Sequence, residues 1–209
     1  MPYQTVNYLG VFFDKVYDFL PVRGKTVIDI GANIGDSCIY FALRGSCNII
    51  GFEPFPKNYE LAKKNIEANS LTEKITLQLA GCAGHNGEII IDPLYKSNVG
   101  SCLKEFKRGI NVPLLTLRDI LNQYNIIRGQ AVLKMDCEGC EYDTILSSTV
   151  DTLRFFSHIQ VEYHHGNRNL KEKLEKSGFL VSVTRPSKEH SVDDKSILYA
   201  GYLYAIKRD

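Results

Sequence analysis

Acidic residues stand at the ends of four separate apolar segments of this sequence. They are Asp29, Glu53, Asp136 with Glu138, and Glu162, which is followed closely by His164. If the apolar segments are parallel strands of one sheet, ligands bind at the edge where those strands end. A carboxylate there can accept hydrogen bonds from ligand hydroxyls, and a carboxylate or a histidine can take up a proton. The sequence therefore predicts one binding rim built from distant segments.

The segment from Thr26 to Gly35 has the pattern of a buried strand, a glycine-rich turn and the start of a helix. Gly31 and Gly35 let the backbone turn tightly and approach a ligand, and the first turn of a helix offers free N–H groups. Glu53 stands roughly 18 residues after Gly35, close to the spacing at which an acid binds the hydroxyls of a cofactor ribose. Pro54 follows it and is a further candidate. These features predict a nucleoside cofactor.

The glycine-rich turn does not fit a dinucleotide. The pattern G-x-G-x-x-G, begun at Gly31, requires glycine where this chain has Asn33 and Asp36. Asp36 would also repel a pyrophosphate at the helix N-terminus. Asp29 would instead face a cationic cofactor such as S-adenosylmethionine, with turn N–H groups or the cofactor's amino group as the partners that a buried carboxylate needs. A nicotinamide-dependent dehydrogenase is the weaker alternative, and a cofactor-binding module without catalytic activity is a third.

Asp136 and Glu138 are predicted to contact the substrate. They follow the apolar segment 131–135, where they can orient a substrate hydroxyl or accept its proton as the new bond forms. Asp136 could alternatively cap the following helix, because aspartate is a good N-cap residue. Glu162 and His164 are candidates for the same chemistry from the neighbouring segment, since histidine accepts protons near neutral pH.

Cysteine and acid spacing does not by itself predict a metal site. Cys137 and Cys140 form a single C-x-x-C pair, which has too few ligands for a closed zinc site. A magnesium ion held by Asp136, Glu138 and Glu162 stays open as an alternative, because Mg²⁺ prefers oxygen ligands. The six cysteines of the chain are expected to be reduced thiols, used partly as small hydrophobic residues.

Composition indicates one soluble α/β domain over residues 1–209. The chain is 44% hydrophobic and 23% charged with a net charge of +1, so a nucleic-acid partner is not expected. The sequence has no secretory signal and no apolar stretch long enough to span a bilayer. We therefore expect a cytoplasmic protein with a small-molecule substrate. Its oligomeric state is left open.

Strand and helix patterns alternate along the chain, as in a doubly wound sheet. Within residues 1–24, an amphipathic helix is predicted from Leu9 to Leu20, where it would cover one edge of the sheet. Further helices are predicted at 37–43, at 56–69, after Thr116 and at 170–178. Strands are predicted at 26–30, 48–52, 75–80, 131–135, 159–163, 179–184 and 198–206.

Residues 84–112 are predicted to be an insertion that contacts the substrate. A short strand at 88–92 leads into a polar stretch without helical period, and such long irregular segments are commonly binding loops. Polar and small residues of this stretch are Ser97, Asn98, Gly100 and Ser101. A tight turn is expected at 81–84, and it adds Gly81 and Cys82 to the candidate cofactor residues.

Four motifs resemble those of the FkbM family of S-adenosylmethionine-dependent methyltransferases. They are Asp29-Ile-Gly-Ala-Asn-Ile-Gly35, Gly51-Phe-Glu-Pro54, Lys134-Met-Asp-Cys-Glu-Gly-Cys-Glu141 and Gln160-Val-Glu-Tyr-His164. The resemblance implies a Rossmann-like seven-stranded sheet, mostly parallel with an antiparallel C-terminal strand pair. It also implies O-methylation of a hydroxyl on a sugar or another small molecule. The cofactor residues that it implies are Asp29, Gly31, Asn33, Gly35 and Glu53, and its active-site candidates are Asp136, Glu138 and Glu162.

Overall fold

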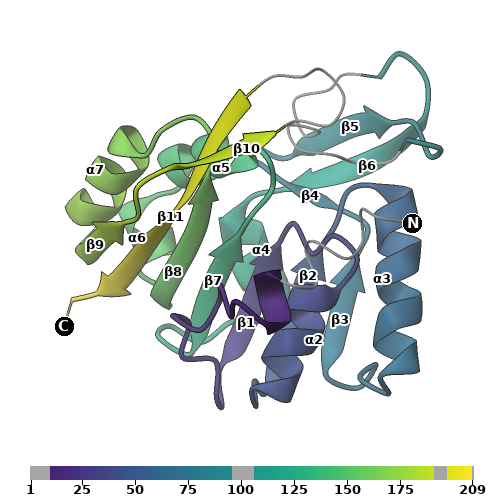
Figure 1. The fold of residues 1–209 in the computed structure, drawn as a ribbon, viewed down its shortest axis with the longest axis horizontal. Helices are drawn as coiled ribbons and strands as arrows, with labels where there is room; N and C mark the ends of the chain where they lie inside the picture. Colours follow the sequence, from purple (N-terminus) through teal and green to yellow (C-terminus); the bar gives the residue numbers. More distant parts are fainter. Residues whose placement is uncertain (1–9, 96–105, 191–196, 209) are drawn as a thin grey trace.

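The computed structural model describes residues 10–95, 106–190 and 197–208, which form a central sheet with helices on both faces (Figure 1). The sheet has eight strands in the order β10-β11-β8-β7-β1-β2-β3, and β9 also pairs with β11. The strands are β1 (Thr26–Ile30), β2 (Asn48–Phe52), β3 (Ile75–Gln78), β7 (Ala131–Met135), β8 (Phe156–Tyr163), β9 (Phe179–Val183), β10 (Ser187–His190) and β11 (Ile197–Lys207). The strands from β3 to β8 are parallel, and β11 is antiparallel to β8, β9 and β10. The predicted mostly parallel sheet with an antiparallel C-terminal pair is confirmed, and β10 is an addition to it.

The register of the central strands brings their ends to one level. Ile30 of β1 is paired with Phe52 of β2 on one side and with Met135 of β7 on the other. All three strands are runs of buried residues, as expected where helices cover both faces of a parallel sheet. The residues that follow, among them Glu53 and Asp136, therefore leave the sheet together at the same rim.

Helices cover the two faces of the sheet. On one face, α2 (Asp36–Leu43) and α3 (Pro56–Ala68) pack with Val27, Ile49 and Val132 of the central strands. On the other face lie α4 (Leu117–Gln123), α5 (Cys140–Ser147), α6 (Val150–Leu153) and α7 (Arg168–Lys176). The Thr116 side chain caps α4 by accepting a hydrogen bond from the Asp119 N–H, as its sequence position predicts.

A second, three-stranded sheet lies beside the first, and it corrects one prediction. Its strands are β4 (Gly81–Cys82), β5 (Gly87–Ile91) and β6 (Ile110–Leu115), in the order β4-β6-β5. The expected tight turn at 81–84 is wrong, because Gly81 and Cys82 pair with Leu114 and Leu115. The predicted short strand at 88–92 is present as β5, which forms an antiparallel hairpin with β6. The polar tip with Ser97, Asn98, Gly100 and Ser101 lies outside the described residues.

The N-terminal segment is the largest departure from the sequence prediction. Among the residues of this segment that the structure describes, helix is present only at 10–12, and Lys15 has a positive φ of 53°, which ends any helical path. Tyr17 and Leu20 are nevertheless buried against the face that carries α2. The Gln160 side chain of β8 donates to the Val16 carbonyl at 2.8 Å, so the segment crosses the sheet face rather than an edge. The apolar spacing therefore reflects burial without a helix.

Two of the cysteines are bonded to each other. Cys137 and Cys140 form a disulfide, so the expectation of reduced thiols is wrong for this pair, whereas Cys38, Cys47 and Cys82 are free.

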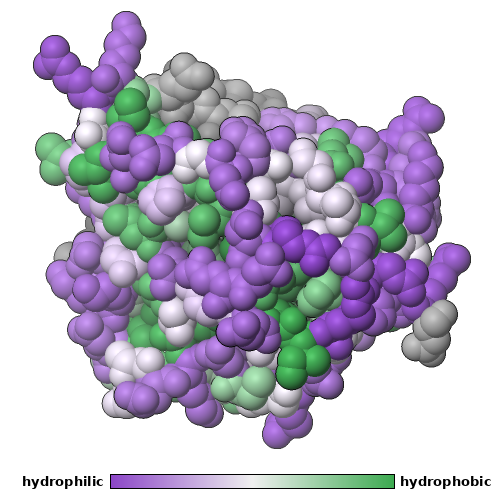
Figure 2. Space-filling view, turned by 180° about the vertical axis from the view of Figure 1, so that it is seen from behind, coloured by the Kyte–Doolittle hydropathy of each residue, from purple (hydrophilic) through white to green (hydrophobic). Residues whose placement is uncertain are grey.

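On the surface seen from behind, apolar residues are interspersed among hydrophilic ones (Figure 2). Within the described ranges, no helix combines the length and the hydropathy that a membrane span requires.

Candidate active site

Glu53 is held in the interior at the end of β2. Its carboxylate is only 4% exposed, and its two oxygens accept hydrogen bonds from the backbone N–H groups of Asn33 and Phe55, each at 2.9 Å. Burial raises the pKa of Glu53 to about 8, against the opposing effect of these two donors. Because an ionised carboxylate has roughly four acceptor positions, two remain for a diol. Pro54, half-buried, leads from Glu53 into α3.

Contacts within the protein explain both glycines of the turn. Gly31 has a φ of 81°, and a Cβ there would lie 1.8 Å from the Asp136 carbonyl oxygen. Gly35 has a φ of 83°, and its Cβ would lie 3.2 Å from that of Ala62 in α3. Asn33 also has a positive φ, of 47°. The turn is thus packed closely on β7 and α3, and its contact with a cofactor stays a prediction.

Asp29 finds partners that the sequence prediction did not include. Its carboxylate is fully buried, 2.9 Å from the Lys134 ammonium of β7, and the Ser37 hydroxyl donates to it at 2.6 Å. Lys134 also donates to the Gly31 carbonyl at 2.7 Å. These partners replace the turn N–H groups that were expected, and contact with a cofactor amino group stays a prediction. The signal that was missed is a lysine inside an apolar strand, directly opposite Asp29 in register.

The electrostatics around this pair favour the charged form of Lys134. Burial lowers the pKa of Lys134, but the charges of Asp29, Asp136 and Asp36 outweigh it and raise that pKa overall. Asp36, at the start of α2, is buried, and its Oδ2 has no hydrogen-bond partner in the described part of the chain. Burial raises the pKa of Asp36 to about 6, so it is still mostly ionised at pH 7. A pyrophosphate would meet that negative charge, whereas a cationic cofactor would not be repelled.

Asp136, Glu138 and His164 come together at the ends of β7 and β8. One ligating atom from each lies within 4.8 Å of the others. His164 is 5% exposed; its Nδ1 is 2.8 Å from Glu141 Oε1, and its Nε2 is 3.5 Å from Glu138 Oε2. Burial lowers the pKa of His164, but the hydrogen bond to Glu141 and the charges of Glu138, Glu141 and Asp136 outweigh it and raise that pKa to about 9.

Glu141 organises the loop between β7 and α5. It is fully buried, and its Oε2 accepts a hydrogen bond from the Gly139 N–H at 2.9 Å. Glu138 and Gly139 both have positive φ values, of 59° and 125°. Gly139 is the N-cap residue of α5, so the alternative in which Asp136 caps this helix is wrong. Sequence analysis did not select Glu141, although it stands in the last acidic position of the Lys134–Glu141 motif.

Tyr17 connects the N-terminal segment to this site. Its hydroxyl donates to Asp136 Oδ2 at 3.2 Å, and its ring lies 5.5 Å from the Lys134 ammonium. Burial, followed by the charges of Asp136 and Glu162, raises the pKa of Tyr17 well above its ordinary value. Sequence analysis did not select Tyr17, because Tyr17 and Asp136 are 119 positions apart in the chain.

Two other candidates, Gly81 and Cys82, are accounted for by packing, whereas Glu162 lies near enough to Tyr17 to raise the pKa of that residue. Cys82 is 4% exposed and packs in the core beside Thr144, so its side chain does not face the rim. A Cβ at Gly81 would lie 2.7 Å from the Leu114 side chain, which accounts for the glycine by packing. Glu162 is half-buried within β8, opposite Tyr202 of β11.

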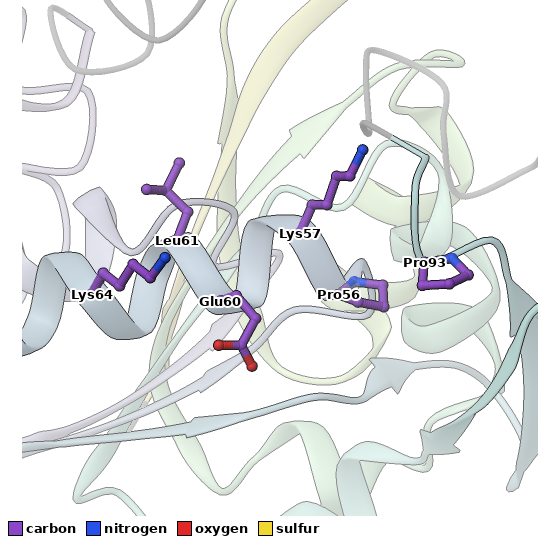
Figure 3. A pocket seen from close by; sticks show the side chains of 6 residues that line it. All are labelled: Pro56, Lys57, Glu60, Leu61, Lys64 and Pro93. Atoms are coloured by element: carbon purple, nitrogen blue, oxygen red, sulfur yellow. The ribbon is translucent and has the colours of Figure 1, made fainter.

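A surface depression of about 260 Å³ lies along α3, and the residues that line it differ from the candidate residues at the rim. In Figure 3 its Lys57 and Glu60 side chains extend in opposite directions from the helix. It is lined by Pro56, Lys57, Glu60, Leu61, Lys64 and Pro93. None of the strand-end acids contributes to it.

Proteins with methyltransferase names resemble this chain in sequence. Methyltransferase 1 of Beauveria bassiana (strain ARSEF 2860) is 22% identical over 202 residues, which cover 84% of this chain and 81% of that protein. Methyltransferase sdnD of Sordaria araneosa is 23% identical over 229 aligned residues, which cover 92% of this chain and 88% of that protein.

Solved structures of methyltransferases share the fold. The N-terminal domain of EvdMO1, crystallised in the presence of SAH and D-fucose, matches 93% of this chain and 81% of its own, with a TM-score of 0.55 and 12% identity. An S-adenosylmethionine-dependent O-methyltransferase from Thermotoga maritima matches 94% of this chain and 64% of its own, with a TM-score of 0.53 and 15% identity. Residues 29–185 match the Methyltransferase FkbM domain, and the chain therefore belongs to the FkbM methyltransferase family.

Proposed function

We propose that this protein transfers the methyl group of S-adenosylmethionine to a hydroxyl oxygen of a sugar or another small molecule. Membership of the FkbM family supports the methyltransferase class and this cofactor. The observation that carries the proposal is the placement of Glu53 and Asp136 at one rim, on the two strands that flank β1. One carboxylate can then bind the methyl donor while the other contacts the acceptor.

Residues around β1 and β2 suit the cofactor. Glu53 has acceptor positions left for the two ribose hydroxyls, and Asn33 is fixed beside it by its N–H bond and by the Asn58 amide at 2.8 Å. The negative charge of Asp36 near the turn suits a cation rather than a phosphate. When bound, S-adenosylmethionine supplies an electrophilic methyl group on a positive sulfur. Gly31, Gly35, Pro54, Gly81 and Cys82 complete the proposed cofactor site through their backbones.

Asp136 is the proposed proton acceptor on the acceptor side. The Tyr17 hydroxyl binds its Oδ2 and so leaves Oδ1 for a substrate hydroxyl. His164 is less accessible, because its ring is 5% exposed and its Nδ1 is bound to Glu141. As the oxygen–methyl bond forms and the sulfur–methyl bond breaks, the hydroxyl proton passes to Asp136. Positioning of the two reactants supplies much of such catalysis, about 7–11 kcal/mol in favourable cases.

Transfer of isotopically labelled methyl groups to a panel of sugars, phenols and other hydroxylated molecules tests this proposal. We expect a methyl ether product, and we expect Asp136→Asn to lose most turnover while it binds S-adenosylhomocysteine normally. The exposed Asp14→Asn variant is the matched control. Full turnover by Asp136→Asn would show that the base is another residue. Tight cofactor binding without transfer to any acceptor would favour the non-catalytic module over the enzyme.

A further inference from the structure

We propose that Asp136, Glu138 and His164 bind one divalent transition-metal cation beside the acceptor. The inference rests on the proposed function, because it states how the acceptor hydroxyl is held. These side chains come from two separate elements, the loop after β7 and the end of β8. One ligating atom from each lies within 4.8 Å of the other two.

The orientation of His164 is the observation that points to a ligand. Its side chain is 3% exposed, and Nδ1 is 2.8 Å from the carboxylate of Glu141, which is itself wholly buried. Nε2 is thereby aimed at Glu138, but at 3.5 Å it is beyond normal N–H···O hydrogen-bond length. A histidine whose other nitrogen is bound to a buried carboxylate is the arrangement that orients metal-binding histidines.

The cluster fits one ion after a contraction. Three ligands at about 2.1 Å from the same ion lie about 3.0–3.6 Å from one another. Separations of up to 4.8 Å must therefore shorten by up to about 2 Å. Glu138 can supply that movement, because its side chain is 29% exposed, whereas His164 is fixed.

The ligand types select the class of ion. Imidazole is a ligand for Zn²⁺, Fe²⁺ and Ni²⁺, carboxylates also suit Mn²⁺, and Mg²⁺ prefers sites made of oxygen alone. Two carboxylates with one imidazole therefore favour a first-row transition metal such as Mn²⁺. A second group, Cys137, Cys140 and Glu141, is not available while the two sulfurs are bonded to each other.

Such an ion would bind the substrate directly. Three protein ligands leave coordination positions open, and two neighbouring hydroxyls of an acceptor could occupy them. The charge of the ion would lower the pKa of a bound hydroxyl and so make its proton easier to remove. Acceptors with vicinal hydroxyls would accordingly be preferred over those with a single hydroxyl.

Titration of the full chain with Mn²⁺, followed by electron paramagnetic resonance in buffer without thiols, tests the site. We expect one saturable Mn²⁺ per chain. Glu138→Gln and His164→Asn should each weaken binding at least about tenfold, and Glu141→Gln should weaken it about 10–100-fold through the orientation of His164. Glu172→Gln, an exposed glutamate of α7, is the matched control and should bind as the parent chain does. Mg²⁺ should displace the bound Mn²⁺ only at higher concentration, in a competition that is read from the Mn²⁺ signal.

Two results would overturn the inference. One is the absence of saturable Mn²⁺ binding at millimolar concentration, which would leave His164 as an ion-pair partner of Glu138 and Glu141 alone. The other is binding that Glu138→Gln, the variant least able to disturb the fold, leaves unchanged. Calorimetry with S-adenosylhomocysteine on the same samples separates this inference from the proposed function. Cofactor binding without Mn²⁺ binding would overturn only the proposed metal site. Mn²⁺ binding without cofactor binding would overturn only the proposed methyltransferase activity.

Discussion

Buried charges set the geometry of this rim at the scale of single residues. Asp29 and Lys134 neutralise each other inside the sheet, and Lys134 also holds the Gly31 carbonyl. Within the described ranges, Glu53 is buried without a cationic partner at hydrogen-bonding distance and depends on two backbone N–H groups. The first arrangement fixes the turn at Gly31, and the second leaves a carboxylate whose binding of hydroxyl donors stays a prediction.

The pH dependence of cofactor binding should report on Glu53. Its pKa of about 8 means that the free protein holds a proton there at neutral pH, whereas two ribose hydroxyls require the ionised form. Binding therefore releases a proton, and affinity for S-adenosylhomocysteine should rise by up to about tenfold per pH unit between pH 6.5 and 8, then level off. Calorimetry across this range measures the affinity. Glu53→Gln is the comparison variant and should bind weakly at every pH. An affinity of the parent chain that is constant over the range would contradict this role.

Breaking the Asp29–Lys134 pair should be strongly destabilising. Lys134→Met leaves the fully buried Asp29 carboxylate without its cation, and such uncompensated charges cost about 3–5 kcal/mol of unfolding free energy. Urea unfolding measures the loss. The double variant Asp29→Asn/Lys134→Met removes both charges and should recover part of it. A loss below about 1 kcal/mol in the single variant would show that Asp29 is not ionised in the folded protein.

At the scale of elements, predictions succeeded where burial and local pattern agree. β1, β2 and β7 have the predicted bounds, because central parallel strands are continuous apolar runs. The helix prediction for the N-terminal segment was wrong, because a helical spacing of apolar residues also fits an irregular segment that packs across a face of the sheet. The β4-β6-β5 sheet was missed because its pairing joins residues far apart in sequence.

Site candidates could likewise be selected only where the local pattern indicates them. Glu53 and Asp136 were selected because each directly follows a segment that the sequence predicts to be a strand. Lys134, Glu141 and Tyr17 were not, because their roles depend on partners that only the folded chain brings near: Asp29, His164 and Asp136.

The N-terminal segment should contribute to turnover through one hydroxyl. Tyr17→Phe removes the hydrogen bond to Asp136 and should lower the turnover number several-fold while affinity for S-adenosylhomocysteine stays unchanged. Unfolding free energy should fall by about 1–2 kcal/mol. Tyr124→Phe is the matched control, because the Tyr124 hydroxyl has no partner within the described residues. Equal turnover for Tyr17→Phe and the control would remove Tyr17 from the site.

The loop between β7 and α5 should depend only modestly on its disulfide for stability. Cys137 and Cys140 are 3 positions apart, and closing so short a loop contributes about 2 kcal/mol at most. The double variant Cys137→Ser/Cys140→Ser should therefore remain folded in urea titrations with a loss of this size. Thiol counting under denaturing, non-reducing conditions checks the bond itself. Reactive thiols at both positions in the untreated protein would contradict it.

At the scale of the whole molecule, the sheet order explains why distant motifs act together. β7 and β2 flank β1, so the residues after three strands far apart in sequence meet at one rim, and β8 adds His164 beside them. The antiparallel β9 and β11 close the other edge of the sheet beyond β8. The FkbM motifs are thus spread along the chain but gathered by the fold.

Calorimetric titration with S-adenosylhomocysteine at pH 8 tests the central claim most directly, on the parent chain and on Glu53→Ala. We predict one cofactor per chain for the parent. Glu53→Ala loses two hydrogen bonds to a charged acceptor, so its affinity should be at least about tenfold lower. No heat of binding for the parent, or equal affinity for both proteins, would contradict a methyl-donor site built on this carboxylate.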